Sequence, residues 1–196
     1  MSKQNILIPF SSPHKQHLLY EGLHLKLQQR NGWEYVTRRN LSGIVAVLAV
    51  TLDEKILLVE QYRPPLHCNV IEIPSGLVGD IAGSENEAFA EAAQRELFEE
   101  TGYRADSMEK LMEGPVSAGL STEIITFFCA SGLKKEGIGG GDSTENIRLH
   151  EVPLNNINDW LNKRQHEGIL IDCKIYAALF FEVQRRQIQK GLFYSS

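Results

Sequence analysis

The sequence predicts an α+β fold, in which a mixed β-sheet packs against helices and a small antiparallel β element precedes it. Short apolar runs rich in β-branched residues occupy 44–51, 56–62 and 124–130, as is typical of interior strands. Apolar residues recur at helical spacing in 155–164 and 172–189, which predicts two C-terminal helices with core-facing stripes. At 196 residues, the chain suits one main domain with a modest N-terminal appendage.

Residues 1–41 form the predicted N-terminal β-rich element, and residues 42–196 form the main domain. Apolar and polar residues alternate over 23–27, Asn31-Gly32 is a strong two-residue hairpin signal, and 33–37 continues as a second strand. A lone hairpin is marginally stable in water. We therefore expect this element to pack on the main domain or on a second subunit.

The main domain begins with the strands 44–51 and 56–62, joined by a turn at 53–55, and we expect these two strands at the centre of the mixed sheet. A short strand follows at 70–74, where Glu72 interrupts an apolar run and requires a partner. The segment 103–113 predicts a strand interrupted at 105–107, and 124–130 predicts a buried strand.

An acidic helix is predicted between Ser84, an N-cap followed three residues later by Glu87 as in a capping box, and Gly102, a stop signal.

Three glutamates crowd this predicted helix. Glu96 and Glu100 are one turn apart and face the same way, while Glu99 flanks them. Like charges at this spacing destabilise an isolated helix, so a divalent cation with oxygen ligands is the natural way to offset the repulsion. The alternative interpretation is an ordinary solvated acidic face.

The spacing of residues around the glutamates favours the cation. Glu87, seven residues, Arg95-Glu96-Leu97, one residue, Glu99-Glu100, one residue and Gly102-Tyr103 together resemble the Nudix hydrolase signature. The best counterpart of the glycine that the family places ahead of the first glutamate is Gly76, which puts roughly five extra residues into the loop before the helix.

The resemblance implies a Nudix fold, an α/β/α sandwich with a central mixed sheet between helices. It implies Mg²⁺-dependent hydrolysis, with Mn²⁺ as a substitute, of a nucleoside diphosphate linked to another group, most closely ADP-ribose or another nucleotide sugar. The products would be a nucleoside monophosphate and a sugar phosphate. Glu96, Glu100 and the Ser75 carbonyl would ligate metal, with Glu99 assisting, and Arg95 would fix the glutamates through charge-assisted hydrogen bonds.

The same resemblance suggests further site residues. Arg63, in a stretch that resembles the nucleotide-sugar branch, would contact the diphosphate, and Glu72 would lie beside the substrate. Glu123 would hold substrate or metal-bound water, with a surface residue as the alternative.

Glu145 would be the general base or a further metal ligand, delivered by the glycine-rich loop 134–142, with Asp142 as the fallback. Trp33 or Tyr35 either stacks on a nucleobase or buries the hairpin. In the family branch, the N-terminal sheet also helps to build a homodimer.

The composition and net charge of the chain also bear on its partners and its location. The net charge of −5 argues against a nucleic-acid or anionic-membrane partner. The three cysteines lack metal-ligand spacing, and no signal segment or membrane-spanning run is visible, which predicts a cytoplasmic location. Alternatives to the leading function are a Nudix enzyme for a GDP-sugar or a coenzyme A derivative, and a Nudix-like sensor that binds a nucleotide without cleaving it.

Overall fold

The computed structural model describes residues 16–79, 83, 86–141 and 146–189, and the contacts divide the chain into two units. The first unit holds the chain up to Arg39 together with Ser117–Glu123. The second unit holds Asn40–Val116 and the chain from Ile124 onward. None of the helices in the described ranges is long and apolar enough to span a membrane.

The first unit contains a three-stranded antiparallel sheet in the order β1-β2-β3, made of β1 (Gln16–Glu21), β2 (Leu25–Arg30) and β3 (Trp33–Arg38). Asn31 and Gly32 both have positive φ, 54° and 80°, and turn the chain so that Arg30 pairs with Trp33. These angles are typical of the two-residue turn that Asn-Gly favours. The predicted hairpin is confirmed.

The second unit contains two four-stranded mixed sheets and a two-stranded ribbon. The first sheet has the order β7-β4-β10-β9, made of Ser75–Val78, Gly43–Ala49, Ile124–Ser131 and Ser107–Pro115. The second has the order β12-β5-β6-β13, made of Ile147–Pro153, Lys55–Arg63, Cys68–Glu72 and Leu170–Ile171. The ribbon pairs β8 (Tyr103–Arg104) with β11 (Lys134–Lys135). The helical segments are η1 (Pro64–Leu66), α1 (Phe89–Thr101), η2 (Leu154–Asn156), α2 (Ile157–His166) and α3 (Lys174–Gln189).

The expectation that 44–51 and 56–62 lie together at the centre of one sheet is wrong. The first run lies on β4 and the second on β5, and these strands belong to different sheets, joined only by an isolated bridge between Val50 and Ile56. Both hydrogen-bonding edges of β4 are occupied, by β7 on one side and β10 on the other. A strand has only two such edges, so none remains for β5.

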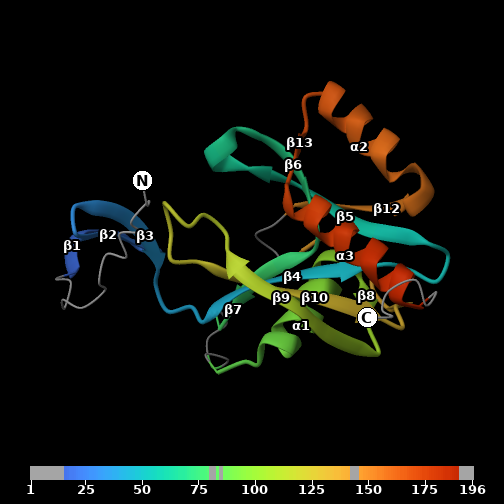
Figure 1. Ribbon diagram of the computed structural model, residues 1–196, viewed down its shortest axis with the longest axis horizontal. Helices are drawn as coiled ribbons and strands as arrows, with labels where there is room; N and C mark the ends of the chain where they lie inside the picture. Colours follow the sequence, from blue (N-terminus) through green and yellow to red (C-terminus); the bar gives the residue numbers. More distant parts are fainter. Residues whose placement is uncertain (1–15, 80–82, 84–85, 142–145, 190–196) are drawn as a thin grey trace, which may run out of the picture. The chain divides into compact units, whose positions relative to one another are not determined.

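Strand β4 lies between two hydrophobic cores, which creates the layers seen in Figure 1. Val45 and Val47 point into the core shared with α1, whereas Ala46 and Leu48 point into the core shared with α2 and α3. The alternation follows from the two-residue period of a strand, and it explains why nearly every residue of β4 is apolar. Helices cover both sides of the sheet, so the predicted α/β/α arrangement is confirmed.

Helix α1 begins later than the sequence suggested. Its first residue is Phe89, and the Glu91 carboxylate accepts a hydrogen bond from the Ala88 N–H at 3.4 Å. Glu87 therefore precedes the helix and bonds to a side chain in it, while the expected N-cap, Ser84, lies outside the described residues. The C-terminal prediction is confirmed, since Gly102 ends the helix at φ 74° and donates to the Phe98 carbonyl at 2.8 Å.

Candidate functional site

Two glutamates of α1 are buried against strand β7. Glu96 is 8% exposed and Glu100 is 3% exposed, although carboxylates are rarely buried without partners. Glu100 Oε2 accepts a hydrogen bond of 3.0 Å from the Ser75 N–H. The Glu96 carboxyl group lies on Gly76, where an added Cβ would be only 1.9 Å from the carboxyl carbon. The absence of a side chain at Gly76 therefore creates the space that the Glu96 carboxylate fills.

Arg95 ties the other acidic residues of this cluster together. Its guanidinium donates to both carboxylate oxygens of Glu87, at 3.1 and 3.2 Å, to Glu96 at 2.8 Å and to Glu99 at 3.1 Å. It also donates to the Leu77 carbonyl at 3.0 Å, which connects the helix to β7. Burial alone would lower the pKa of Arg95, but the bonds with Glu87 and the nearby charge of Glu96 outweigh it and raise the pKa. Arg95 thus offsets the like charges crowded on this helix.

The glycine-rich segment packs on the C-terminal end of α1. The N–H groups of Gly140 and Gly141 donate to the carbonyls of Glu100 and Glu99, at 2.9 and 3.0 Å, and satisfy groups that a helix end leaves open. An added Cβ on Gly139 would lie 2.5 Å from the Thr101 carbonyl carbon, so only glycine allows this approach. We expected a mobile loop from its composition. In its described part, the segment is held by backbone hydrogen bonds to the acidic helix.

A second charged cluster lies where β5, β6 and α3 meet. Arg63 Nε and Nη2 both lie 2.6 Å from Glu72 Oε2, and Lys174 Nζ lies 3.7 Å from Glu72 Oε1. Lys174 also bonds to the Asp172 carboxylate. Glu72 is 6% exposed, and its burial raises the pKa of the carboxyl group despite the two cations. Burial acts in the same direction on Asp172, but the bonds from Lys174 prevail and lower its pKa.

Two of the predicted site residues lie in the first unit. Trp33 is 64% exposed, and its indole N–H donates to the Gly119 carbonyl at 2.8 Å. Glu123 pairs with Arg38 at the end of β3. Tyr35, the alternative to Trp33, is half-buried, with its ring 5.8 Å from the Arg30 guanidinium.

The other predicted site residues that the structure describes form two separate groups in the second unit. Glu96, Glu99, Glu100, Arg95 and Ser75 form one cluster around α1 and β7. Arg63 and Glu72 contact each other on the hairpin whose second strand ends three residues before Ser75. Glu145 and its alternative, Asp142, lie outside the described residues.

Two contributions to these clusters were missed in the sequence. Lys174 and Asp172 follow Glu72 by about a hundred residues, and no local pattern connects them to it. The contact between Gly76 and Glu96 likewise depends on the packing of a strand against a helix.

The oxygen atoms of this cluster are of the chemical type that binds a divalent cation. Carboxylate and carbonyl oxygens are the ligands that hard cations prefer, and the cluster offers two buried carboxylates held in place by Arg95 and the Ser75 N–H. Glu99 is more exposed, with 39% of its side chain accessible. Within the described ranges, no three His, Cys, Asp or Glu side chains converge closely enough to form a complete ligand set. A cation here would therefore draw on Glu96 and Glu100 first, completed by further oxygen ligands.

A surface hollow of about 650 Å³ lies elsewhere in the second unit. It is lined by the turn between β4 and β5, by η2 with the start of α2, and by α3, including the buried Glu182 and its partner Arg186. None of the predicted site residues lines it. Size alone does not make this hollow the candidate site, because the clustered carboxylates lie around α1 and β7.

The comparison with known proteins points to the part of the chain that contains α1 and β7. A family model described as NUDIX domain matches residues 43–172, which include both charged clusters of the second unit except Lys174. A crystal structure of an ADP compounds hydrolase superposes with a TM-score of 0.69 at 20% identity, covering 91% of this chain and 95% of that chain. At this identity the superposition shows a shared fold and no more.

Two curated relatives are more similar in sequence. The chain is 38% identical over 151 residues to the methanol dehydrogenase activator of Bacillus methanolicus, covering 76% of this chain and 75% of that protein. It is 41% identical over 113 residues to the ADP-ribose pyrophosphatase of Bacillus subtilis (strain 168), covering 57% of this chain and 58% of that protein.

Proposed function

The chain belongs to the Nudix family of hydrolases, and we propose that it cleaves the diphosphate bond of a nucleoside diphosphate linked to a second group. ADP-ribose or another nucleotide sugar is the proposed substrate, and a nucleoside monophosphate and a sugar phosphate are the products. The observation that carries this proposal is the pair of buried carboxylates, Glu96 and Glu100, held on one face of α1 by Arg95 and the Ser75 N–H.

Mg²⁺ is the proposed cofactor, with Mn²⁺ as a substitute, held by Glu96, Glu100 and the Ser75 carbonyl, with Glu99 and Glu145 as further ligands. A divalent cation there would neutralise diphosphate charge and lower the pKa of a bound water. Arg95 acts on the protein side, because its guanidinium holds Glu96 and Glu99 in fixed positions. Glu145 is the proposed general base, with Asp142 as the alternative.

Arg63 and Glu72 are the proposed substrate contacts in the second unit. A guanidinium can donate two parallel hydrogen bonds to a phosphate, and 38% of the Arg63 side chain is accessible. Trp33 and Glu123 are the proposed contacts in the first unit. The exposed indole of Trp33 offers a stacking surface for a nucleobase.

A panel of nucleotide sugars tests the proposal. Each compound is incubated with the protein and Mg²⁺, and phosphate is measured after a phosphatase has been added to release it from the products. Phosphate release from ADP-ribose or another nucleotide sugar supports the proposal. The compound that is cleaved fastest identifies the branch of the family. Turnover of a GDP-sugar or a coenzyme A derivative alone would favour the alternative enzymes. Binding without turnover would favour a nucleotide sensor.

A second candidate function is the activation of a dehydrogenase, because the chain is 38% identical to a methanol dehydrogenase activator over three quarters of both proteins. The test is the rate of methanol oxidation by the dehydrogenase of Bacillus methanolicus with and without this chain. A rate increase that the Glu100→Gln variant fails to produce would link activation to the hydrolase site. An unchanged rate would exclude this candidate for that dehydrogenase.

We also propose that residues 1–41 form a dimerisation element and that the protein is a homodimer. Large apolar side chains of this element are exposed, among them Leu18, Tyr20 and Leu23 at 53%, 68% and 81%. Such exposure on a small sheet is typical of a surface that another chain covers. Light scattering that shows a monomer at micromolar concentration would contradict the proposal.

The proposed location is the cytoplasm. Cys68, Cys129 and Cys173 are all free, which fits a reducing compartment.

A further inference from the structure

We propose that Lys174 is a positioning residue that allows Arg63 to exchange its contact with Glu72 for a contact with the diphosphate of the substrate. The inference rests on the proposed function, because it takes Arg63 as a residue that binds the diphosphate. The evidence is the way two cations share one buried carboxylate.

The two cations approach different oxygens of Glu72. Arg63 places Nε and Nη2 on Oε2, each at 2.6 Å, while Lys174 Nζ lies 3.7 Å from Oε1. The carboxylate therefore keeps one cation near it if the other departs. Two positive and two negative charges, counting Asp172, balance in this cluster.

The four side chains differ in how far they reach the solvent. Accessible fractions are 7% for Glu72, 15% for Asp172, 20% for Lys174 and 38% for Arg63. Arg63 is thus the outer cation, able to turn toward a ligand. Lys174 is the inner cation, since Asp172 accepts bonds from both its backbone N–H and its ammonium group.

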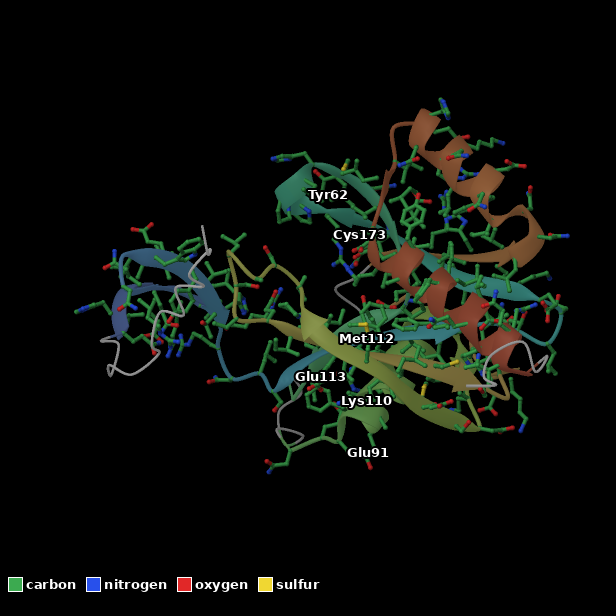
Figure 2. The ribbon with its side chains drawn as sticks, viewed as in Figure 1. Tyr62, Glu91, Lys110, Met112, Glu113 and Cys173 are labelled. Atoms are coloured by element: carbon green, nitrogen blue, oxygen red, sulfur yellow. The ribbon has the colours of Figure 1, made fainter. Side chains whose placement is uncertain are left out.

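The backbone holds Lys174 at this position. The Asp172 N–H donates to the Ile71 carbonyl at 2.9 Å, directly after β13 has paired with β6. Figure 2 labels Tyr62 on the β5–β6 hairpin and Cys173 just before α3, and these two residues are the chain neighbours of Arg63 and Lys174. Helix α3 therefore begins beside the strand that ends at Glu72.

The cluster is also close to the acidic helix. Only Ile73 and Pro74 separate Glu72 from Ser75, whose N–H bonds to Glu100. Three residues of fully extended chain span at most about 11 Å. The Glu72 partner of Arg63 and the Ser75 partner of Glu100 are therefore attached to backbone positions within about 11 Å, a separation compatible with one metal-bound diphosphate.

These distances define what Lys174 does. If Arg63 moved away and no other cation lay near Glu72, the buried carboxylate would be left without charge compensation. The free-energy cost of that uncompensated charge would disfavour the exchange. With Lys174 present, Glu72 keeps a partner while Arg63 binds the diphosphate. Removing Lys174 should therefore lock Arg63 onto Glu72 and weaken binding of the substrate.

The test measures binding of adenosine 5′-(α,β-methylene)diphosphate, which cannot be cleaved at the bridging position, by isothermal titration calorimetry with Mg²⁺ present. Lys174→Met should raise the Kd at least about tenfold. Lys174→Arg should stay within about threefold of the wild type, because the charge is kept. Lys163→Met, which removes an exposed lysine of α2, is the matched control and should bind like the wild type.

A second comparison tests whether Lys174 acts through Glu72. In a Glu72→Gln background the carboxylate that Arg63 must leave is gone, so adding Lys174→Met should change the Kd by less than about twofold. This comparison is informative even if the single Lys174→Met variant folds poorly. In steady-state assays, the KM of Lys174→Met should rise with the Kd while kcat changes little.

Several results would overturn the proposal. Wild-type-like binding by Lys174→Met would do so, and so would a tenfold further loss in the Glu72→Gln background. If the wild type binds the probe but cleaves no nucleoside diphosphate, the proposed hydrolysis fails and the Kd comparisons still decide the role of Lys174. If the wild type binds no nucleoside diphosphate at all, both proposals fail.

Discussion

Substitution of Gly76 by alanine tests whether the position of the Glu96 carboxylate matters for the reaction. The new Cβ would lie 1.9 Å from the Glu96 carboxyl carbon and 2.0 and 2.3 Å from its oxygens. To reach an ordinary contact of 3.4 Å, the carboxyl group must retreat by about 1.5 Å. The atoms that clash are at the end of a flexible side chain, so the carboxylate can move while the strand and the helix stay in place.

The expected effects on stability and on rate therefore differ. Overpacking costs about 1–3 kcal/mol, and replacing glycine by alanine lowers unfolded-state entropy enough to recover about 0.4–1 kcal/mol. The free energy of unfolding should fall by no more than about 2.6 kcal/mol. A misplacement of about 1 Å at a reacting centre can cost about 100-fold in rate, so kcat should fall by about that factor.

The assay combines urea unfolding with hydrolysis rates measured over a range of Mg²⁺ concentrations. The Mg²⁺ concentration for half-maximal rate should rise in Gly76→Ala, because a ligand has been displaced. Gly114→Ala on β9 is a matched control, since its Cβ would meet only the terminal methyl of Met112, at 3.2 Å. A Gly76→Ala variant with a wild-type rate and Mg²⁺ dependence would refute the role assigned to Glu96.

Two further predictions concern stability. Gly139→Ala should lower the free energy of unfolding by about 2–4 kcal/mol in urea titrations, because its Cβ would meet the Thr101 backbone and φ is +73°; unchanged stability would contradict the docking of this segment on α1. Burial tends to raise the pKa of Glu60, but hydrogen bonds from His150 and Asn69 lower it below 4.5, so its contribution to stability is present above that pH and is lost as the pH falls. Glu60→Gln should therefore be less stable at pH 7 and lose less on acidification from pH 5 to 3 than the wild type, and parallel stability curves would contradict this.

Local chemistry made part of the fold predictable. Asn31-Gly32 specifies its turn through φ angles that these two residues adopt readily, and Gly102 ends α1 for the same reason. Alternating or continuous apolar runs located β2, β4, β5 and β10, whereas β7 and β12 were not predicted. The division of β4 and β5 between two sheets was not predictable, because strand pairing depends on which edges distant strands occupy.

The candidate site shows the same limit. The helical spacing of Glu96 and Glu100 placed them on one face before any contact was known. The start of α1 was misplaced because Glu87 bonds to the Arg95 side chain, a tertiary contact that capping rules do not include. Lys174 reaches Glu72 from a distant part of the chain, and the glycine-rich segment, which composition marked as a mobile loop, packs closely on a helix end.

The most direct test of the account is the turnover number of Glu100→Gln on the best nucleotide-sugar substrate. Glutamine keeps the size of the side chain and an oxygen that can accept the Ser75 N–H, but it removes the charge needed to hold a divalent cation. We predict that kcat falls by roughly 10³-fold or more while the circular dichroism spectrum stays that of the wild type. Wild-type-like turnover in a folded Glu100→Gln variant would contradict the claim that the buried carboxylates of α1 hold the metal.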